Sequence, residues 1–379
     1  MKTAAIISEY NPLHNGHKFH IEETKRQTGA DAVVLIMSGN FVQRGEVAIY
    51  DKKLRARAAT ICGADLCLEL PTIYSSASAE FFSMGAVKIL NALGIIDFLS
   101  FGAETANPSL LMTAAQLLAN ESAEYSALLT EYLAKGISYP AARAKAVGRI
   151  LGKSFEKLLS TPNNILAIEY CKALISTGSE IMPCPILRKG AAHDSHTPDG
   201  DIASATFIRN LILSGGDSSP FIPNSAEEIF NGAGIHSLKS LEKAILCELV
   251  KMPAHQLRTI SDVSEGLENR IKFAAAESKT LDELLEKIKT KRYTLSRIRR
   301  IVLSAFLGIT ADDRSAEPSY IKILDHNQVG QKLISAAKSV ATLPIVRNTS
   351  QINRLKNPSL KEMWERERVF DQIYDLSLL

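Results

Sequence analysis

Short apolar runs alternate with amphipathic stretches through the first hundred residues. The runs that predict buried strands are Thr3–Ser8 (TAAIIS), Ala32–Met37 (AVVLIM), Asp65–Leu70 (DLCLEL, stopped by Pro71) and Ile96–Phe101 (IDFLSF). The stretches with helical spacing are Gly16–Gln27, Lys52–Cys62 and Ser78–Leu93, and the polar segment SGNFVQRGE is expected to be a loop. Nearly continuous apolar strands are typical of sheets that are covered on both faces. Because repeated strand–helix units with short loops form parallel sheets, the pattern predicts an α/β fold.

Beyond the first hundred residues, the predicted secondary structure changes twice. Residues 108–175 have helical spacing, Glu180–Leu187 predicts a fifth strand at a sheet edge, and Ser204–Leu213 predicts a helix with a serine N-cap. The Gly-, Ser- and Pro-rich residues 214–225 predict a linker, and residues 226–379 are expected to be mostly helical. We therefore expect a catalytic domain over 1–215, with a helical insertion at about 108–175, followed by a helical domain over 226–379.

Composition narrows the class of protein. The chain has 379 residues, of which 46% are hydrophobic and 22% charged, as in a folded globular protein. Its net charge of +3 gives no general sign of nucleic-acid binding, so an anionic partner would need a local patch. The five cysteines are scattered without a C-x-x-C pair, which favours reduced thiols. No signal peptide or membrane-spanning run is evident, and we expect a cytoplasmic protein without a membrane partner.

The strongest local motif is His14-Asn15-Gly16-His17, which follows the first predicted strand and opens the first predicted helix. The carboxyl ends of parallel strands are where α/β sheets bind ligands, and free N–H groups at a helix start favour phosphate. The two imidazoles can donate hydrogen bonds to phosphate oxygens during displacement at phosphorus. His20 lies one turn after His17 and either continues this face or has no direct role.

A second, weaker motif lies at the start of the Ser204–Leu213 helix. Ser204 and Thr206 carry small hydroxyl groups there, and Arg209 follows about one turn later. Such a helix start can bind phosphate through N–H groups and a guanidinium, although an ordinary N-cap with a surface arginine has the same pattern.

Together, the two motifs resemble the HIGH-type nucleotidyltransferase superfamily, whose H-x-G-H motif follows strand one and whose I-S-[ST]-T-x-I-R-like motif follows the last strand of a Rossmann-like (HUP-type) sheet. Ala205 stands where many members have a hydroxyl. More narrowly, IISEYNPLHNGH, MSGNFVQRGEVAIYDKKLRARAA, GADLCLELPTIYSSASAEFFSMGAVKIL, SFGAE, LSTPNNILAIEY, ILRKG, EGLENRIKFAA and TKRYTLSRIRR resemble the bacterial tRNA(Met) cytidine acetate ligase family over residues 1 to about 309.

This resemblance implies a reaction and a set of partners. Members of that family activate acetate with ATP to acetyl-adenylate. They then transfer the acetyl group to N4 of the wobble cytidine (C34) of elongator tRNA(Met), which forms N4-acetylcytidine and releases AMP and pyrophosphate. The expected partners are thus ATP, acetate and elongator tRNA(Met), not DNA. Mg²⁺ is expected with ATP, but no carboxylate cluster in the sequence identifies a protein-supplied metal site.

The resemblance also implies site residues. His14 and His17 are expected to be catalytic. The expected ATP contacts are Ile7, Ser8, Glu9, Tyr10, Asn11, Pro12, Leu13, His14, Asn15, Gly16, His17, Lys18, Phe19, His20, Gly102, Asn163, Arg188 and Lys189, with lesser support from Ser204, Thr206 and Arg209 for phosphate.

The segment KIKTKRYTLSRIRR, residues 287–300, carries many cationic groups and no acidic one. Basic groups can bind a phosphate backbone, and an aromatic ring can stack on an unpaired base. With the family's tRNA substrate in view, Lys291, Arg292 and Arg297 are expected to contact the backbone, and Tyr293 to pack or to stack. Arg44, Arg55 and Arg57 could extend this surface toward the ATP site. From composition alone, the segment could equally be a solvated helix face that Glu283 and Glu286 balance.

Two other functions fit parts of the pattern. A simple adenylyltransferase would use the same ATP site on a small phosphorylated precursor, but would not need the helical third of this chain. A non-enzymatic ATP-binding regulator associated with RNA would bind ATP without releasing AMP. The segment His193–His196 could be half of a metal site, but no second cluster completes it, and a flexible polar loop is favoured. The oligomeric state and the general base are not indicated by the sequence.

Overall fold

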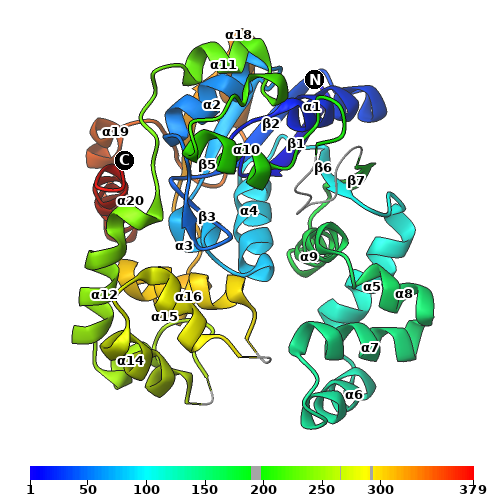
Figure 1. Cartoon of the computed structure of the whole chain (residues 1–379). Helices are drawn as coiled ribbons and strands as arrows, with labels where there is room; N and C mark the ends of the chain where they lie inside the picture. Colours follow the sequence, from blue (N-terminus) through cyan, green and yellow to red (C-terminus); the bar gives the residue numbers. More distant parts are fainter. Residues whose placement is uncertain (189–197, 265, 291–292) are drawn as a thin grey trace.

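The computed structural model describes residues 1–188, 198–264, 266–290 and 293–379. A seven-stranded sheet runs through its centre (Figure 1). Across the sheet the strands are β7 (Met182–Leu187), β6 (Phe98–Ala103), β1 (Thr3–Ser8), β2 (Ala32–Ser38), β5 (Leu66–Leu70), β8 (Ile321–His326) and β9 (Ile345–Val346). All neighbouring strands are parallel except β5 and β8, which are antiparallel. The predicted parallel α/β sheet is confirmed, and the fifth predicted strand, β7, lies at one edge.

Helices cover both faces of the sheet because side chains of successive strand residues point to opposite sides. On one face, Val33, Leu35 and Met37 of β2 share a core with α1 (Asn15–Thr28), α2 (Lys52–Ile61), α10 (Ala205–Leu213) and α11 (Asn224–Phe230). On the other face, Val34 and Ile36 share a core with α4 (Ala79–Leu93), α9 (Pro162–Ser176) and α18 (Gln328–Ala337). The buried apolar patterns of β1 and β2 therefore have the expected two-sided cover.

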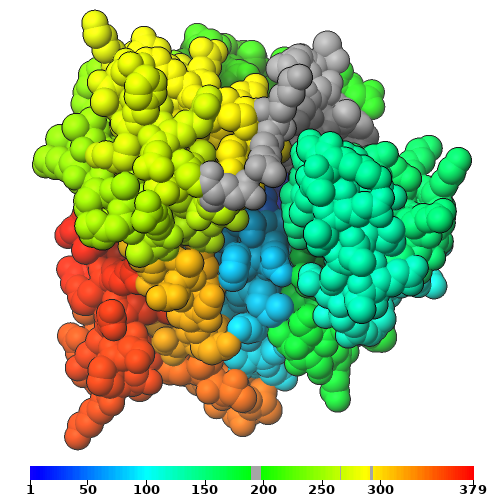
Figure 2. Space-filling view, turned by 90° about the horizontal axis from the view of Figure 1, so that it is seen from below, coloured from blue at the N-terminus to red at the C-terminus, as the bar shows by residue number. Residues whose placement is uncertain are grey.

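Two groups of helices extend from the same side of the sheet (Figure 1). The insertion after β6 contains α5 (Pro108–Asn120), α6 (Ala123–Ala134), α7 (Tyr139–Leu151) and α8 (Lys153–Leu158), and it leads into α9. The second group contains η2 (Leu238–Leu241), α12 (Glu242–Lys251), α13 (Ala254–Leu257), α14 (Leu267–Glu277), α15 (Leu281–Ile288), α16 (Leu295–Leu307) and α17 (Ala311–Ser315). Figure 2 shows these two groups, in teal and in yellow-green to yellow, facing one another on one side of the molecule.

The structure corrects two sequence expectations and adds two strands to a region that is mostly helical, as expected. The loop predicted at SGNFVQRGE contains a small hairpin of β3 (Phe41–Val42) and β4 (Glu46–Val47). The predicted linker at 214–225 is packed, with η1 (Ser219–Phe221) in it and Phe221 and Ile222 buried. The region 226–379 is largely helical, but β8 and β9 return to the central sheet. The last helices of this region, α19 (Thr349–Arg354) and α20 (Pro358–Asp375), follow β9. In the amino-terminal half, a short helix, α3 (Thr72–Ser75), follows β5.

Buried ion pairs attach the end of the chain to the sheet. The Lys52 ammonium, 2% exposed, lies 2.6 Å from the carboxylate of Glu69 on β5 and 2.5 Å from that of Asp371 on α20. Lys322 of β8 lies 2.5 Å from the second oxygen of Glu69. Because each buried charge has an opposite partner, the carboxyl-terminal strands and helix are held against the amino-terminal half. The parts on either side of residue 215 therefore share one sheet.

Candidate functional site

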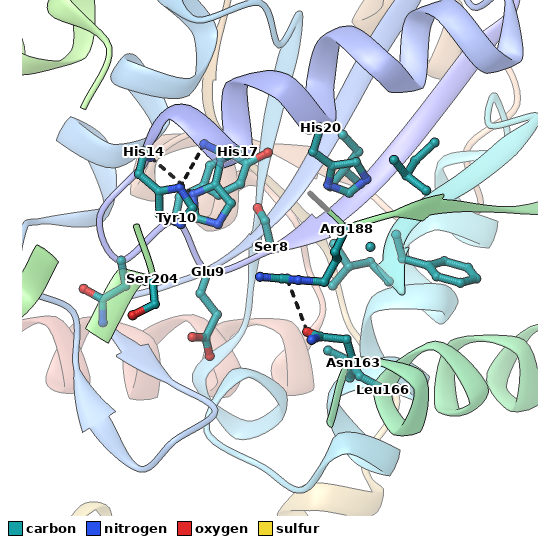
Figure 3. A pocket seen from close by; sticks show the side chains of 18 of the residues that line it. Ser8, Glu9, Tyr10, His14, His17, His20, Asn163, Leu166, Arg188 and Ser204 are labelled. Atoms are coloured by element: carbon teal, nitrogen blue, oxygen red, sulfur yellow. Dashed lines mark hydrogen bonds between the residues drawn. The ribbon is translucent and has the colours of Figure 1, made fainter. Parts of the chain in front are cut away.

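A pocket of about 230 Å³ opens at the carboxyl end of β1 (Figure 3). Its wall comes from the β1–α1 segment, from β6 and β7, from α9 and from the start of α10. The predicted residues that line it are Ile7, Ser8, Glu9, Tyr10, Asn11, His14, Gly16, His17, Phe19, His20, Gly102, Asn163, Arg188, Ser204, Thr206 and Arg209. The tertiary structure thus brings together motifs that lie almost 200 residues apart in the chain.

His14 and His17 form a reciprocal cap at the start of α1. The Nδ1 atom of His14 accepts a hydrogen bond from the backbone N–H of Gly16 at 3.1 Å. The Nδ1 atom of His17 accepts one from the backbone N–H of His14 at 3.3 Å. A neutral imidazole carries one proton, and a nitrogen that accepts an N–H does not hold it. In both rings the proton is therefore on Nε2, which is left as a hydrogen-bond donor.

All three histidines of this segment are held in the neutral form. Burial, and then Arg188 and Arg209, lower the pKa of His14 to about 3. Burial lowers the pKa of His17 well below its usual value, and the neighbouring His14 adds to this effect. Burial lowers the pKa of His20 to about 4, and its Nε2 lies 3.0 Å from Ser100 Oγ. The site therefore offers neutral N–H donors, and its positive charge comes from arginines.

A second helix start meets the first at this pocket. Ser204 caps α10 by accepting a hydrogen bond at its Oγ from the N–H of Phe207 at 3.1 Å. Thr206 Oγ1 accepts from Arg209 at 3.2 Å and from Arg44 at 3.4 Å, and Arg209 also donates to the carbonyl of Asn11 at 2.8 Å. Two positive helix ends and two guanidinium groups therefore converge where a phosphate chain could lie.

The opposite wall is formed by residues at the edge of the sheet. Arg188 follows β7, and its guanidinium donates to Asn163 Oδ1 at 3.3 Å, as Figure 3 shows. A Cβ atom on Gly102 of β6 would lie only 3.2 Å from Cγ of Arg188, so glycine gives this side chain its space. Asn163 is the second residue of α9, which places it beside the pocket as the resemblance implied.

Among the described residues that line the pocket, Glu9 is the carboxylate. Its Oε1 accepts a hydrogen bond from the N–H of Gln43 at 2.7 Å. Burial raises the pKa of this carboxyl, while the bond from Gln43 and the charges of Arg209, Arg44 and Arg55 oppose that rise. Among the described residues, no group of three or more His, Cys, Asp or Glu side chains could hold a metal ion.

Four residues of the Ile7–His20 segment do not line the pocket. Leu13 is fully buried in the core, and Pro12 follows the cis peptide bond after Asn11. Asn15 donates to the carbonyls of Asp201 and Pro220, at 2.9 and 3.1 Å, and Lys18 lies 3.9 Å from Glu22. ATP contact by these four stays a prediction. Lys189 and the segment His193–His196 lie outside the described residues.

Several lining residues were not predicted. They include Gln43, Phe82, Phe101, Leu166, Tyr170, Ile186 and Leu187. Leu166 and Tyr170 follow Asn163 by three and seven residues, so one face of α9 presents all three to the pocket. Helical periodicity applied from Asn163 would have identified them. The β3–β4 turn supplies Gln43, for which the sequence has no comparable signal, and Arg44, which was expected to extend the basic surface toward this site.

The basic segment 287–300 lies in the second helical group. Lys291 and Arg292 are outside the described residues. Tyr293 is 8% exposed, and the guanidinium of Arg297 lies 4.9 Å from the centre of its ring. Arg297 also donates to the carbonyl of Asp262 at 2.7 Å. The structure thus places Tyr293 in a packed position, one of the two expected for it.

Helix α16 also touches the turn that carries Arg44. A Cβ atom on Gly45 would lie 2.6 Å from the backbone of Arg299 and Arg300, and Arg299 lies 2.7 Å from Glu46. The basic segment is therefore directly attached to one wall of the pocket. Arg55 does not extend this surface, because it is fully buried and donates to backbone carbonyls. Arg57 remains largely exposed.

Comparisons with known proteins show what this chain is similar to. A family model described as HIGH Nucleotidyl Transferase matches residues 1–378. The tRNA(Met) cytidine acetate ligase of Acetivibrio thermocellus is 40% identical, over 99% of this chain and 94% of that protein. The protein of the same name from Thermoanaerobacter sp. (strain X514) is 39% identical, over 100% and 96%.

Solved structures of Thermotoga maritima TmcAL are also similar to this chain. The apo form I has a TM-score of 0.93 at 31% identity and covers 99% of this chain and 94% of its own. A second structure, bound with alpha-thio ATP, has a TM-score of 0.92 at 31% identity and covers 100% and 95%. Within the described ranges, no helix is both long and apolar enough to span a membrane.

Proposed function

The chain belongs to the HIGH nucleotidyl transferase family and, within it, to the tRNA(Met) cytidine acetate ligases. On that premise we propose that it is an ATP-dependent ligase. It would acetylate N4 of the wobble cytidine of elongator tRNA(Met) with acetate as the acetyl source. The observation that carries the proposal is the convergence of the His14–His17 cap, the start of α10 and the arginines Arg44, Arg188 and Arg209 on one pocket. Support also comes from the relatives' names and from the alpha-thio ATP bound to the Thermotoga maritima protein.

The first step would be adenylation of acetate. An acetate oxygen attacks the α-phosphorus of ATP, the bond to the bridging oxygen breaks, and pyrophosphate leaves with the electron pair. Negative charge shifts onto phosphate oxygens as this happens. The Nε2–H donors of His14 and His17, the N–H groups at the two helix starts and the guanidinium groups would stabilise that charge.

The second step would transfer the acetyl group. The exocyclic amine of cytidine is a poor nucleophile because its lone pair is delocalised into the ring, so acetate must first become a mixed anhydride. The amine attacks the acetyl carbonyl carbon, loses a proton, and AMP leaves. A wobble base lies in a loop and can be splayed from its neighbours, which lets it reach a pocket.

Mg²⁺ is expected to accompany ATP and to neutralise its phosphate charge. It usually keeps several waters and binds substrate phosphates together with one or two carboxylates. Glu9 is the pocket carboxylate that could take part. We propose that the metal enters with the nucleotide, since the described residues contain no cluster of three ligands.

The test is incubation of the protein with labelled acetate, ATP and elongator tRNA(Met). Label should enter the RNA, and nucleoside mass spectrometry should find N4-acetylcytidine at the wobble position. Without tRNA, pyrophosphate should exchange into ATP only when acetate is present. Exchange without acetate would instead favour a simple adenylyltransferase, and binding without AMP release would favour a regulator. Label transfer from acetyl-CoA without ATP would contradict the proposed acetyl source.

A further inference from the structure

The segment Ser100–Glu104 (SFGAE) contributes more to the pocket than its glycine. Phe101 and Ala103 point into the apolar core, so Ser100, Gly102 and Glu104 belong to the opposite side of the strand and its continuation. Ser100 Oγ lies 3.0 Å from His20 Nε2, and Gly102 makes room for Arg188. Glu104, the next position in this alternation, has no part in the function described so far.

Glu104 accepts three hydrogen bonds from the start of α9. Its Oε1 accepts from the backbone N–H of Asn163 at 3.2 Å and from Asn163 Nδ2 at 2.6 Å. Its Oε2 accepts from the backbone N–H of Asn164 at 2.7 Å. The N-cap residue of this helix, Thr161, makes no capping hydrogen bond with its side chain. Glu104 therefore takes over the role of the cap from a distant part of the chain.

The same bonds orient the amide of Asn163. Its Nδ2 group donates to Glu104, so its Oδ1 atom is turned away and accepts from Arg188 Nη1 at 3.3 Å. Figure 3 shows the guanidinium of Arg188 above Asn163 in the pocket. If the amide were reversed, its NH₂ group would face a guanidinium that has only donors, and the contact would be lost.

We propose that Glu104 is a positioning residue for the nucleotide: it fixes the amide of Asn163, which in turn holds the guanidinium of Arg188 in the pocket. This inference rests on the proposed function, because Arg188 and Asn163 matter here as the groups that meet ATP. Glu104 itself does not line the pocket. Its effect on the nucleotide therefore passes through the other two side chains.

Glu104→Gln is the informative substitution. Glutamine keeps the size of the side chain, but one of its two terminal atoms is an NH₂ donor that faces the donors of Asn163 and Asn164. We expect the dissociation constant for a non-hydrolysable ATP analogue to rise about tenfold, the scale of one lost charge-assisted contact. Glu124→Gln, an exposed carboxylate at the start of α6, is the matched control and should bind the analogue as the parent does.

A double-mutant cycle separates positioning from a general loss of stability. In an Arg188→Ala background, Glu104→Gln should raise the dissociation constant by no more than about twofold, because its route to the nucleotide is already removed. The same should hold in an Asn163→Ala background, which supplies a second cycle if the first variant binds too weakly to measure. Thermal unfolding of each variant shows whether it is folded at the assay temperature.

The outcomes distinguish the two proposals. Full additivity in both cycles, or parent-like affinity in Glu104→Gln, would overturn the positioning role. Coupling without acetate-dependent AMP release from the parent would uphold that role and count against the proposed ligase. If the parent protein does not bind the analogue at all, both proposals are wrong.

Discussion

The rings of His14 and His17 are stacked, with 3.7 Å between their centres, and each accepts a backbone N–H of the β1–α1 segment at its Nδ1 atom. This relationship makes the two histidines a cap for α1 as well as a pair of Nε2–H donors. A substitution at either position can remove the helix cap, the Nε2–H donor or both, so the variants must be chosen to distinguish these two losses. That requirement shapes the first prediction.

We expect His17→Ala to lower the rate of acetyl-adenylate formation by about 10²-fold or more, the scale of one lost transition-state donor. His14→Asn should have a similar effect on this rate, because asparagine is a good N-cap residue but does not supply the Nε2–H group. Acetate-dependent pyrophosphate exchange measures the rate. tRNA affinity should stay close to that of the parent in both variants, and so should thermal unfolding of His14→Asn, whereas His17→Ala also loses one capping hydrogen bond. An undiminished exchange rate would remove the histidines from the mechanism.

The lowered pKa values of the histidines predict how stability depends on pH. The pKa of His14 is about 3 and that of His20 about 4 in the folded protein, because both rings are buried. In the unfolded chain they take up protons near pH ~6.5, so between these values the unfolded state binds more protons. The free energy of unfolding should therefore fall as the pH is lowered from about 6.5 toward 4. Urea unfolding of the parent and of His20→Asn measures this, and the variant should lose less stability on acidification. An equal loss in both proteins would show that His20 is not the responsible group.

Arg55 and Arg57 provide a matched pair on one helix. Arg55 is fully buried and donates to the carbonyls of Tyr50, Glu9, Ser38 and Gly39. We expect Arg55→Lys to lower the free energy of unfolding by about 3 kcal/mol, since lysine leaves some of these buried acceptors without a donor. Arg57→Lys should change it by less than about 0.5 kcal/mol, because that side chain is 58% exposed. Urea denaturation tests both, and equal effects would mean that the buried carbonyls are satisfied in another way.

The basic segment of the second helical group is expected to hold tRNA. Each lost phosphate contact should lower the salt slope of tRNA binding by about 1, because fewer counterions are released. Charge reversal of Arg292 and Arg297 together should therefore weaken binding and abolish RNA acetylation. Acetyl-adenylate formation without tRNA should survive. Affinity measured against salt concentration, together with tRNA-free AMP production, tests this on one protein.

The control for that experiment is Lys338→Glu with Lys361→Glu, which changes the net charge equally at two exposed positions elsewhere. If both double variants lose affinity alike, the effect comes from total charge. A parent-like slope in the Arg292 and Arg297 variant would show a solvated helix face. If the variant also lost AMP production, the prediction that residues 1–215 carry out the ATP chemistry and residues 226–379 bind tRNA would be contradicted. The contact of α16 with the β3–β4 turn makes this last outcome informative.

Local patterns were sufficient for the amino-terminal core of this protein. The apolar runs of β1 and β2 can be buried only between two helical layers, and the histidine motif directly after β1 can lie only at the carboxyl edge of the sheet. The resemblance added Gly102, Asn163 and Arg188, and all three line the pocket. These features were predictable because each depends on neighbours within a few residues or on a recognisable motif.

Other features were decided only by contacts between distant segments. The strand β8 is a short segment whose partner, β5, lies some 250 residues earlier, and Lys322 becomes a buried ion-pair partner only in that pairing. From the sequence, Arg55 is expected to be a surface cation. Only in the folded protein do the carbonyls of two separate loops surround its guanidinium group. The amide of Asn163 has no defined direction until Glu104 and Arg188, which directly follow β6 and β7, approach it. The sequence by itself determined which groups are present and near which strand end, because those depend on local periodicity. The tertiary structure alone decided their orientation, because a hydrogen bond needs both partners in place.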